Sequence, residues 1–334
     1  MFSVTNDRGF VPQSEQFEGR DMVGEDIKAY KIIHTNDFAY NPARINVGSI
    51  AMYTGEKPCM ISSLYVCFKT TKEVNNEWLM QLLKTPKMNY YYNVNGEGGV
   101  RVYLFYPNFA RIRMSIPKIE EQKKIAKLLN LIDERIATQN KIIEDLKKLK
   151  SAISKKLLCN DKWTTCIIQD IAEIGRGRVI SSVEIDRQKH PRYPVYSSQT
   201  SNNGIMGYLD NYMFDGEYIT WTTDGANAGT VFYRKGKFNC TNVCGTLKIL
   251  PKFDCYFVSL VLQQATQKYV SSNLANPKLM NNTMASIKIR MPNIETQKQL
   301  SKVFQTLDSC LLVHQRTCKM YLSEKQYLLR QMFI

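Results

Sequence analysis

The chain has 334 residues, and its 45 Lys and Arg residues outnumber 30 Asp and Glu residues to give a net charge of +15. This length suits about two domains, and a 44% hydrophobic content lets each bury its own core. Aromatic residues make up 11% and charged residues 22%, which excludes disordered and collagen-like chains. The longest apolar stretch, residues 256–262, is too short to span a bilayer, and the N-terminus has no signal-peptide pattern. The positive excess favours an acidic partner, most often nucleic acid.

The nine cysteines and three histidines predict neither a metal site nor a catalytic triad. Cys240 and Cys244 lie four residues apart, but no second Cys or His pair follows at a zinc-binding distance. Three histidines leave little material for a Ser-His-Asp or Cys-His site. We therefore expect reduced, mostly buried thiols in a cytoplasmic protein.

The first segment, residues 1–115, reads as a globular unit that mixes strands and helices. Residues 62–69 are rich in β-branched and apolar residues and predict a strand, while residues 77–84 predict a short helix. Tyr90, Tyr91 and Tyr92 could stack on bases, but such aromatic side chains more often pack in a hydrophobic core.

Residues 116–158 predict a long helix that recurs at the end of the chain, in residues 291–334. Residues 116–125 and 291–300 share five of ten positions, at an offset of 175 residues. In both copies a Pro precedes the apolar periodicity and a Glu follows in the first turns, as at many helix N-termini. The chain is therefore predicted to be a repeat of globular unit and long helix.

Both predicted helices carry a heptad pattern. The interruptions recur as well, since Gln139 corresponds to His314 and Lys150 to Lys325. We expect the two helices to pair as a coiled coil, with the polar layers fixing the register. The predicted core positions are Ile125, Leu129, Ile132, Ile136, Ile143, Leu146, Leu300, Phe304, Leu307 and Leu311.

Residues 159–290 predict a second globular unit. Residues 244–250 read as a strand and residues 256–269 as a helix, separated by turns rich in Gly and Asn. A weaker repeat links the two globular units, because residues 45–50 resemble residues 226–231 at an offset of 181.

The chain lacks the motifs of the chemistry that often acts on nucleic acids. There is no phosphate-binding loop of the Gly-x-x-x-x-Gly-Lys-Ser/Thr type and no complete dinucleotide motif. Residues 41–44 begin like the Asn-Pro-Pro-Tyr motif of adenine methyltransferases but lack its second Pro and its aromatic residue. We therefore expect no catalytic residues in this chain.

The sequence resembles the specificity subunit of bacterial type I DNA restriction-modification enzymes over essentially its whole length. The strongest element is the repeated Pro-x-x-Glu-x-Gln-Lys start of a long helix, at residues 117–123 and 292–298. Residues 41–49 also look like a stretch of one class of target-recognition domain, and residues 163–177 resemble the usual opening of such a domain.

The resemblance implies an α+β fold with target-recognition domains at residues 1–115 and 159–290. The helices at 116–158 and 291–334 would pair as an antiparallel coiled coil that spaces the domains, with an internal pseudo-twofold repeat. On the 181-residue offset the first domain lacks the region equivalent to Trp163, so it is expected to be shortened at its N-terminus.

The resemblance also implies a function in a larger complex. Each domain would read one half of a split sequence in double-stranded DNA, and the helices would dock methylation subunits, two of them on the internal symmetry, and through them restriction subunits. S-adenosylmethionine, ATP and Mg would be bound by those partners, and this chain would hold no cofactor.

Candidate DNA contacts are polar or basic residues in the predicted loops, where they could reach base edges or phosphates. Asn46 could instead hold a turn, and each basic residue could be a plain surface charge. The candidates are Arg44, Asn46, Arg176, Arg178, Thr222, Thr223, Asn227, Lys235, Lys237, Asn276, Lys278 and Asn281.

A second interpretation is a coiled-coil scaffold whose globular units bind protein. Steep salt dependence of binding to duplex DNA would favour the specificity subunit, because each phosphate contact releases counterions. A stand-alone nuclease or methyltransferase is disfavoured by the missing motifs.

Overall fold

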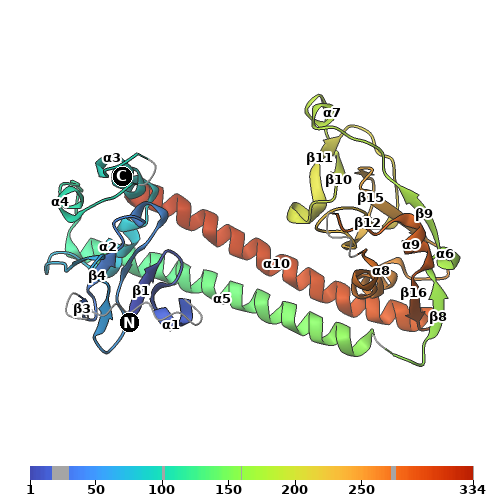
Figure 1. Cartoon of the computed structure of the whole chain (residues 1–334), viewed down its shortest axis with the longest axis horizontal. Coiled ribbons are helices and arrows are strands. Elements are labelled where there is room, and N and C mark those ends of the chain that lie inside the picture. Colours follow the sequence, from blue (N-terminus) through green and yellow to red (C-terminus); the bar gives the residue numbers. More distant parts are fainter. Residues whose placement is uncertain (17–29, 100–101, 159, 272–275, 334) are drawn as a thin grey trace. The chain divides into compact units, whose positions relative to one another are not determined.

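A computed structural model describes residues 1–16, 30–99, 102–158, 160–271 and 276–333. It divides into two compact units (Figure 1). The first unit is Met1–Lys141 with Gln315–Ile334, and the second unit is Ile142–His314. Each unit therefore combines one globular part with a portion of both long helices. No helix in the described part of the chain is long and apolar enough to cross a membrane.

The long helices are α5, Ile119–Leu157, and α10, Ile294–Met332. Each begins after a Pro with the same hydrogen bonds. Gln122 Nε2 donates to Pro117 O at 2.8 Å, and Gln297 Nε2 donates to Pro292 O at 2.8 Å. Both glutamines are buried. From the core side, each one therefore provides a hydrogen-bond donor to the backbone carbonyl just before its helix.

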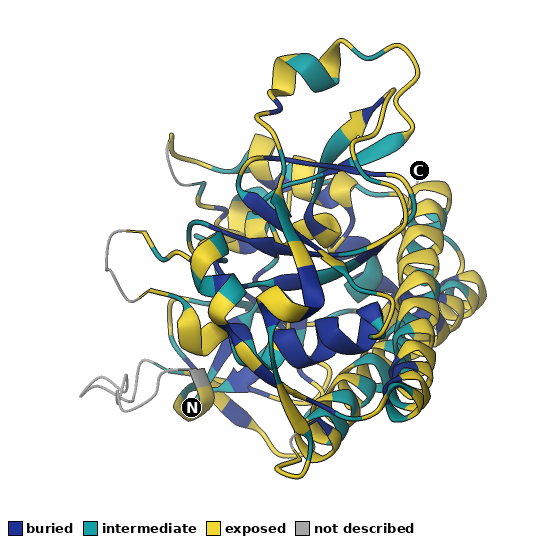
Figure 2. Cartoon of the chain, turned by 90° about the vertical axis from the view of Figure 1, so that its right-hand side faces the viewer, coloured by how far each residue is buried: buried dark blue, intermediate teal, exposed yellow. Residues whose placement is uncertain are grey.

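Within each unit the early part of one long helix lies with the late part of the other. In the first unit Ala126 and Leu129 of α5 share a hydrophobic core with Leu328 of α10. In the second unit Phe304 of α10 shares a core with Ile153 of α5. The helices therefore run antiparallel, as expected, while their outward faces are exposed (Figure 2).

The second unit is built on a four-stranded sheet in the order β13-β12-β15-β9. Trp221 and Leu247 of its central strands are fully buried, and α8 packs on this sheet with an almost continuous apolar sequence. Asp254 caps α8, because its Oδ1 accepts from Phe257 N at 2.8 Å. The strands β15 and β9 are antiparallel neighbours.

Two smaller sheets complete the second unit: β11-β10-β14, and the antiparallel pair β16-β8. The elements of this unit are β8 Thr164–Ile167, α6 Ile168–Ile171, β9 Ala172–Arg176, α7 Ser182–Asp186, β10 Tyr193–Tyr196, η3 Ser201–Gly204, β11 Ile205–Leu209, β12 Glu217–Thr222, β13 Val231–Lys235, β14 Asn239–Cys240, β15 Cys244–Ile249, α8 Cys255–Ala265, η4 Thr266–Tyr269, α9 Asn281–Ser286 and β16 Lys288–Met291. The predicted strand 244–250 and helix 256–269 are thus confirmed as β15 and as α8 with η4.

The first unit has a three-stranded sheet, β5-β4-β7, and a four-stranded sheet, β2-β1-β6-β3. Its elements are β1 Phe2–Thr5, β2 Gly9–Pro12, α1 Gln13–Gln16, β3 Lys31–Ile33, β4 Phe38–Tyr40, η2 Ile45–Val47, β5 Ile50–Met52, β6 Cys59–Ile61, β7 Val66–Phe68, α2 Asn76–Leu83, α3 Pro86–Asn95 and α4 Tyr106–Phe109. The predicted helix 77–84 is confirmed as α2, whereas the predicted strand 62–69 is shorter than expected, because residues 62–65 form a turn, closed by Tyr65 N donating to Ser62 O at 3.2 Å, and only β7 is a strand. Of the three tyrosines, Tyr92 is buried and donates to Leu83 O at 2.7 Å, whereas Tyr90 is exposed.

The internal repeat predicted from sequence appears in the hydrogen bonds of the two units. Leu104 N donates to Pro42 O at 3.0 Å, and its counterpart Leu279 N donates to Thr223 O at 2.9 Å. In each unit the loop that follows the central strand, β4 or β12, is therefore hydrogen-bonded to an equivalent segment later in the chain. The fold is α+β, with two globular parts and paired long helices, as expected.

Candidate nucleic-acid interface

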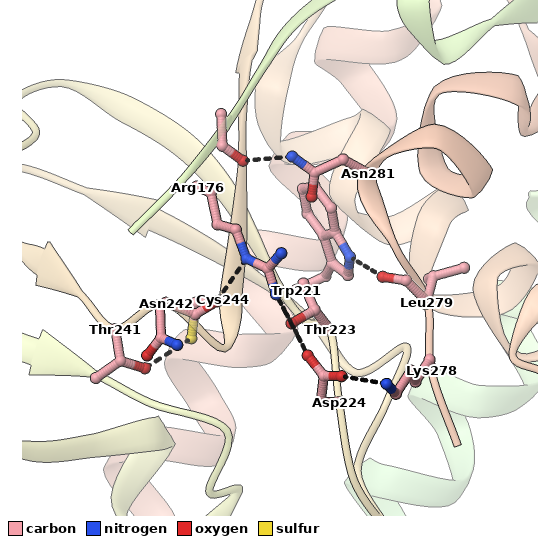
Figure 3. Close-up of polar contacts among 11 residues, drawn as sticks. Arg176, Trp221, Thr223, Asp224, Thr241, Asn242, Cys244, Lys278, Leu279 and Asn281 are labelled. Carbon is pink, nitrogen blue, oxygen red and sulfur yellow. Dashed lines mark hydrogen bonds and ion pairs between the residues drawn. The ribbon is translucent and has the colours of Figure 1, made fainter. Parts of the chain in front are cut away.

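Four of the candidate DNA contacts come together in the second unit, at the end of β12 (Figure 3). Arg176 ends β9, Thr223 follows β12, and Lys278 and Asn281 lie just before and at the start of α9. These residues are far apart in sequence, yet the sheet order places the ends of β9 and β12 on the two sides of β15. The loops beyond these strands form the candidate site.

Backbone hydrogen bonds hold the segment before α9 against the loop after β12. Gly225 N donates to Pro277 O at 3.0 Å, and Trp221 Nε1 donates to Leu279 O at 2.9 Å. Gly229 closes the loop with a φ of +81°, in the left-handed region that favours glycine, and a Cβ there would meet Val270 at 2.7 Å. The loop is thus fixed by its own backbone before any ligand arrives.

Asp224 organises the basic side chains of the site. Its carboxylate lies 3.3 Å from Arg176 Nη2 and 3.8 Å from Lys278 Nζ. Thr223 Oγ1 donates to the same carboxylate at 2.6 Å and lies 3.0 Å from Arg176 Nη2. Arg176 Nε also donates to Asn242 O at 2.5 Å. Two cations therefore share one carboxylate, which leaves the cluster positive and fixes the guanidinium plane.

The other candidates in the loops have supporting contacts. Asn281 Nδ2 donates to Gly175 O at 3.4 Å, and Asn227 Nδ2 donates to Ser198 O at 3.3 Å. Asn276 is exposed. Thr222 and Thr223 are only 1% and 0% exposed. Their hydroxyls lie inside the loop, whereas Asn276 and Lys278 face solvent.

Three basic candidates lie apart from the Asp224 cluster. Arg178 pairs with Glu184, with Nη1 2.9 Å from Oε2, and this hydrogen bond holds the pKa of Glu184 below its usual value. Lys235 pairs with Glu217 at 3.1 Å, at the end of the β12–β13 pair opposite Thr223. Lys237 Nζ lies over the Tyr212 ring at 4.5 Å.

The candidates of the first unit flank the equivalent loop. Arg44 is exposed and precedes η2, which ends at Gly48 with a φ of +96°. Arg44 and Arg8 line a hollow of about 450 Å³ together with Asn41. Asn46 Nδ2 instead donates to Asn93 Oδ1 at 3.1 Å, which ties the loop to α3.

Sequence reasoning missed Asp224 and Arg8 as members of these sites. A single carboxylate such as Asp224 carries no sequence signal until two distant cations converge on it. Arg8 reaches the Arg44 loop through the pairing of β1 with β6 and the packing of its sheet, which no local pattern reveals.

The ten predicted coiled-coil positions are all buried or half-buried. Leu129, Ile132 and Phe304 are the most buried, at 0%, 8% and 0% exposure. The two lysines that interrupt the heptads each reach an aspartate of the other helix. Lys325 Nζ lies 2.7 Å from Asp133 in the first unit, and Lys150 pairs with Asp308 in the second. The two pairs are equivalent under the 175-residue offset.

Among the described residues no group of three or more His, Cys, Asp or Glu side chains is arranged to hold a metal ion. Cys240 and Cys244 are buried, and burial raises the pKa of both thiols. They therefore remain protonated at neutral pH and act as small apolar side chains.

Comparison with known proteins gives a consistent result. The family described as "Type I restriction modification DNA specificity domain" matches residues 25–148 and 160–319. "Putative type I specificity subunit S.MpnORF201P" of Mycoplasma pneumoniae is 38% identical over 197 residues, which is 58% of this chain and 82% of that one. The type I restriction enzyme MpnII specificity subunit of the same organism is 42% identical over 145 residues, 43% of each chain.

Among solved structures, the S subunit of a type I restriction-modification system from M. genitalium superposes with a TM-score of 0.67 at 16% identity. The match covers 90% of this chain and 84% of that one, and at this identity it supports the fold. The two family matches coincide with the two repeats found in the sequence. The chain therefore belongs to the type I restriction-modification DNA specificity family, whose function is DNA sequence recognition.

Proposed function

We propose that each globular unit reads one half of a split target in double-stranded DNA. The observation that carries this proposal is the Asp224 cluster, in which Asp224, on the loop after β12, holds Arg176 at the end of β9 and Lys278 just before α9. A fixed Arg can make the bidentate contacts that distinguish guanine, and a Lys with half of its side chain exposed can reach a phosphate.

The candidate residues divide by their contacts. Arg176, Lys278 and Asn276 have groups that can reach DNA, while the buried Thr222 and Thr223 shape the loop. Asn227 and Asn281 already donate to backbone carbonyls, so their remaining groups would add contacts from a fixed position. In the first unit Arg44 and Arg8 would contact DNA, and Asn46 would position the loop.

Arg178, Lys235 and Lys237 would contribute mainly through their long-range field. Each already has a partner in this chain, and Lys235 lies at the opposite end of its strand from the cluster. A distributed net charge of +15 attracts the DNA backbone even where no single lysine makes a defined contact.

We propose further that the chain is non-catalytic and docks methylation and restriction subunits, which supply S-adenosylmethionine, ATP and Mg chemistry. The surface that supports docking is the outward face of the long helices. It is polar on average but carries exposed apolar side chains that a solitary helix pair has no reason to display. These are Leu128, Leu131 and Leu149 of α5 and Val303, Leu312, Val313, Met320, Leu322 and Tyr327 of α10.

The paired helices would set the gap between the half-sites. An α-helix rises about 1.5 Å per residue, so the number of residues between the two recognition loops determines how far apart they can be held. The Lys150–Asp308 and Lys325–Asp133 pairs would fix the register of this spacer, because a shift by one heptad would leave both lysines without partners.

Methylome sequencing of a host that expresses this chain with its methylation subunit tests the function. We expect a split, adenine-methylated motif that disappears when the chain is absent. In a chain that carries Arg176→Ala and Lys278→Ala, one half of the methylated motif should no longer have a defined base sequence. Methylation of an undivided motif, or of none, would contradict the proposal.

A further inference from the structure

The two units differ at one strand edge. In the second unit β16 pairs antiparallel with β8, with Ile289 opposite Cys166 and Met291 opposite Thr164. The 175-residue offset places β16 on residues 113–116 of the first unit. That segment lies in no helix or strand and has no strand partner among the described residues. The equivalent edge is therefore paired in the second unit and, within the described part of the chain, unpaired in the first.

Burial follows the same division. Met291 and Ile289 are 2% and 3% exposed. Their counterparts are Ile116, which is 50% exposed, and Met114, which is half-buried. An apolar residue that the repeat keeps at a core position is thus in contact with solvent in the first unit. Since moving a large aliphatic side chain out of water is favourable, this edge favours being covered.

A hollow of about 560 Å³ lies beside the open edge, lined by Met114, Ile116, Trp78 and Phe333, among others. Trp78 is 2% exposed, yet its Nε1 has no hydrogen-bond partner in the described part of the chain. A buried indole N–H without an acceptor costs free energy. The site therefore has an unpaired hydrogen-bond donor in addition to its exposed apolar side chain.

The second unit indicates what fits this hollow. Asn75 caps α2 and Asp254 caps α8, and both backbone N–H groups donate to the equivalent Gln122 and Gln297. This match makes Trp78 the counterpart of Phe257. In the second unit Phe257 packs against Trp163, with 5.8 Å between the ring centroids. Trp163 immediately precedes β8. In the second unit the ring beside this position is therefore a Trp that leads into a strand, whereas in the first unit Trp78 has Phe333 beside it at 5.8 Å between ring centroids.

The strands described in the same unit leave a second edge unpaired. In the second unit β9 pairs with β15, but β7, the equivalent of β15, is the last strand of the sheet β5-β4-β7. One continuous segment, residues 163–176, supplies both β8 and β9 in the second unit. A single segment of that kind could cover both open edges of the first unit.

We propose that the first unit binds an extended segment of a separate polypeptide by strand addition along residues 113–116. The segment has the chemistry of residues 163–176: a large aromatic residue, then a run rich in β-branched residues, with a carbonyl to accept from Trp78 Nε1. A second copy of this chain is a poor donor, because its own residues 164–167 are already paired with β16. Backbone hydrogen bonds supply affinity, and the hollow selects the aromatic residue.

The test uses a fluorescent peptide with the sequence of residues 160–177, added to the full chain and followed by anisotropy. We expect saturable one-to-one binding. Ile116→Asp should weaken it about tenfold or more, because a carboxylate would face the added strand. Ile32→Asp is the matched control, since Ile32 is 61% exposed on β3 of another sheet, and it should bind as the unaltered chain does. A peptide with Trp163→Asp should also bind weakly.

Amide hydrogen exchange locates the binding. Peptide should slow exchange in residues 113–116 and leave β16 unchanged. No saturable binding, equal binding by Ile116→Asp and the unaltered chain, or protection at β16 instead would each overturn the proposal. DNA is absent from this assay, so its outcome is independent of the recognition function proposed above.

Discussion

At the scale of single residues, the candidate interface depends on one carboxylate that two cations share. Asp224 accepts from Thr223 and pairs with Arg176 and Lys278. Such an arrangement contributes little to stability at a solvated surface, where an ion pair is worth about 0–1 kcal/mol. Its effect is to keep a guanidinium in one orientation, which direct readout of a base requires.

Substitutions in this cluster should separate orientation from charge. Lys278→Ala should weaken binding to all duplexes and lower the salt slope by about one, because one phosphate contact is lost. Asp224→Asn keeps the size of the side chain but removes the charge that pairs with Arg176 and orients its guanidinium, so we expect binding to random DNA to persist while discrimination falls by about 1–3 kcal/mol. Anisotropy titrations at several salt concentrations, with target and altered duplexes, measure both quantities. Equal discrimination by Asp224→Asn and the unaltered chain would contradict the role of Asp224.

Gly229 should be the costliest glycine of the loop to replace. Gly229→Ala places a Cβ 2.7 Å from Val270 and forces φ near +81°, so we expect a loss above the usual 1–2 kcal/mol for a left-handed alanine. Gly236→Ala is the matched control, because Gly236 has a φ of +95° with nothing within 4 Å of its Cβ. Urea unfolding measures the free energy of unfolding of the two variants. Equal losses would show that the close contact with Val270 does not add to the cost of Gly229→Ala.

The residues also show where sequence reasoning reached its limit. Polar loop residues could be singled out, and Arg176, Thr223, Lys278 and Asn281 do come together. Lys235 was placed with them because nothing local says which end of a strand meets which loop, and its pairing with Glu217 depends on the register of β12 and β13. The burial of Thr223 depends on its contact with Leu279, 56 residues further along the chain.

At the scale of elements, the long helices were predictable and the sheets were not. A heptad pattern is local, so the bounds of the predicted helices, 116–158 and 291–334, all lie within three residues of the observed bounds of α5 and α10. Sheet order depends on pairings such as that of β9 with β15, about seventy residues apart, and no local pattern encodes it. The hydrogen bond of Gln122 to Pro117 explains why the repeated helix start was the clearest sequence signal.

Two aspartates on the paired face of α5 should disrupt the first unit. Ile132→Asp with Ile136→Asp places charges where Ile132 is 8% exposed, so we expect a loss of at least about 3 kcal/mol. Leu131→Asp is the control on the outward face of the same helix, since Leu131 is 50% exposed, and it should change stability little. Circular dichroism during urea unfolding measures both. Comparable stability of the double variant and the control would contradict the pairing.

At the scale of the whole molecule, the proposed spacer makes a quantitative prediction about the target. The division between the units falls at residues 141/142 of α5 and 314/315 of α10, so residues inserted there in both helices leave the contacts within each unit intact. Three added heptads per helix lengthen each by about 32 Å at ~1.5 Å per residue. That is close to one turn of B-DNA, about 34–36 Å or 10–10.5 base pairs.

We therefore expect the chain with three added heptads to direct methylation of the same two half-sites, with a gap longer by about nine or ten base pairs. A single added heptad lengthens the gap by about three base pairs and turns the second half-site by roughly 100° around the DNA, whereas the helix pair turns by only about 20° per heptad. Methylation with that variant should be strongly reduced, because one recognition loop faces away from its groove. Methylome sequencing of hosts carrying each variant provides the comparison. An unchanged gap in the three-heptad variant would show that the helices do not set the spacing, since the added length would then have no effect on where the two units bind.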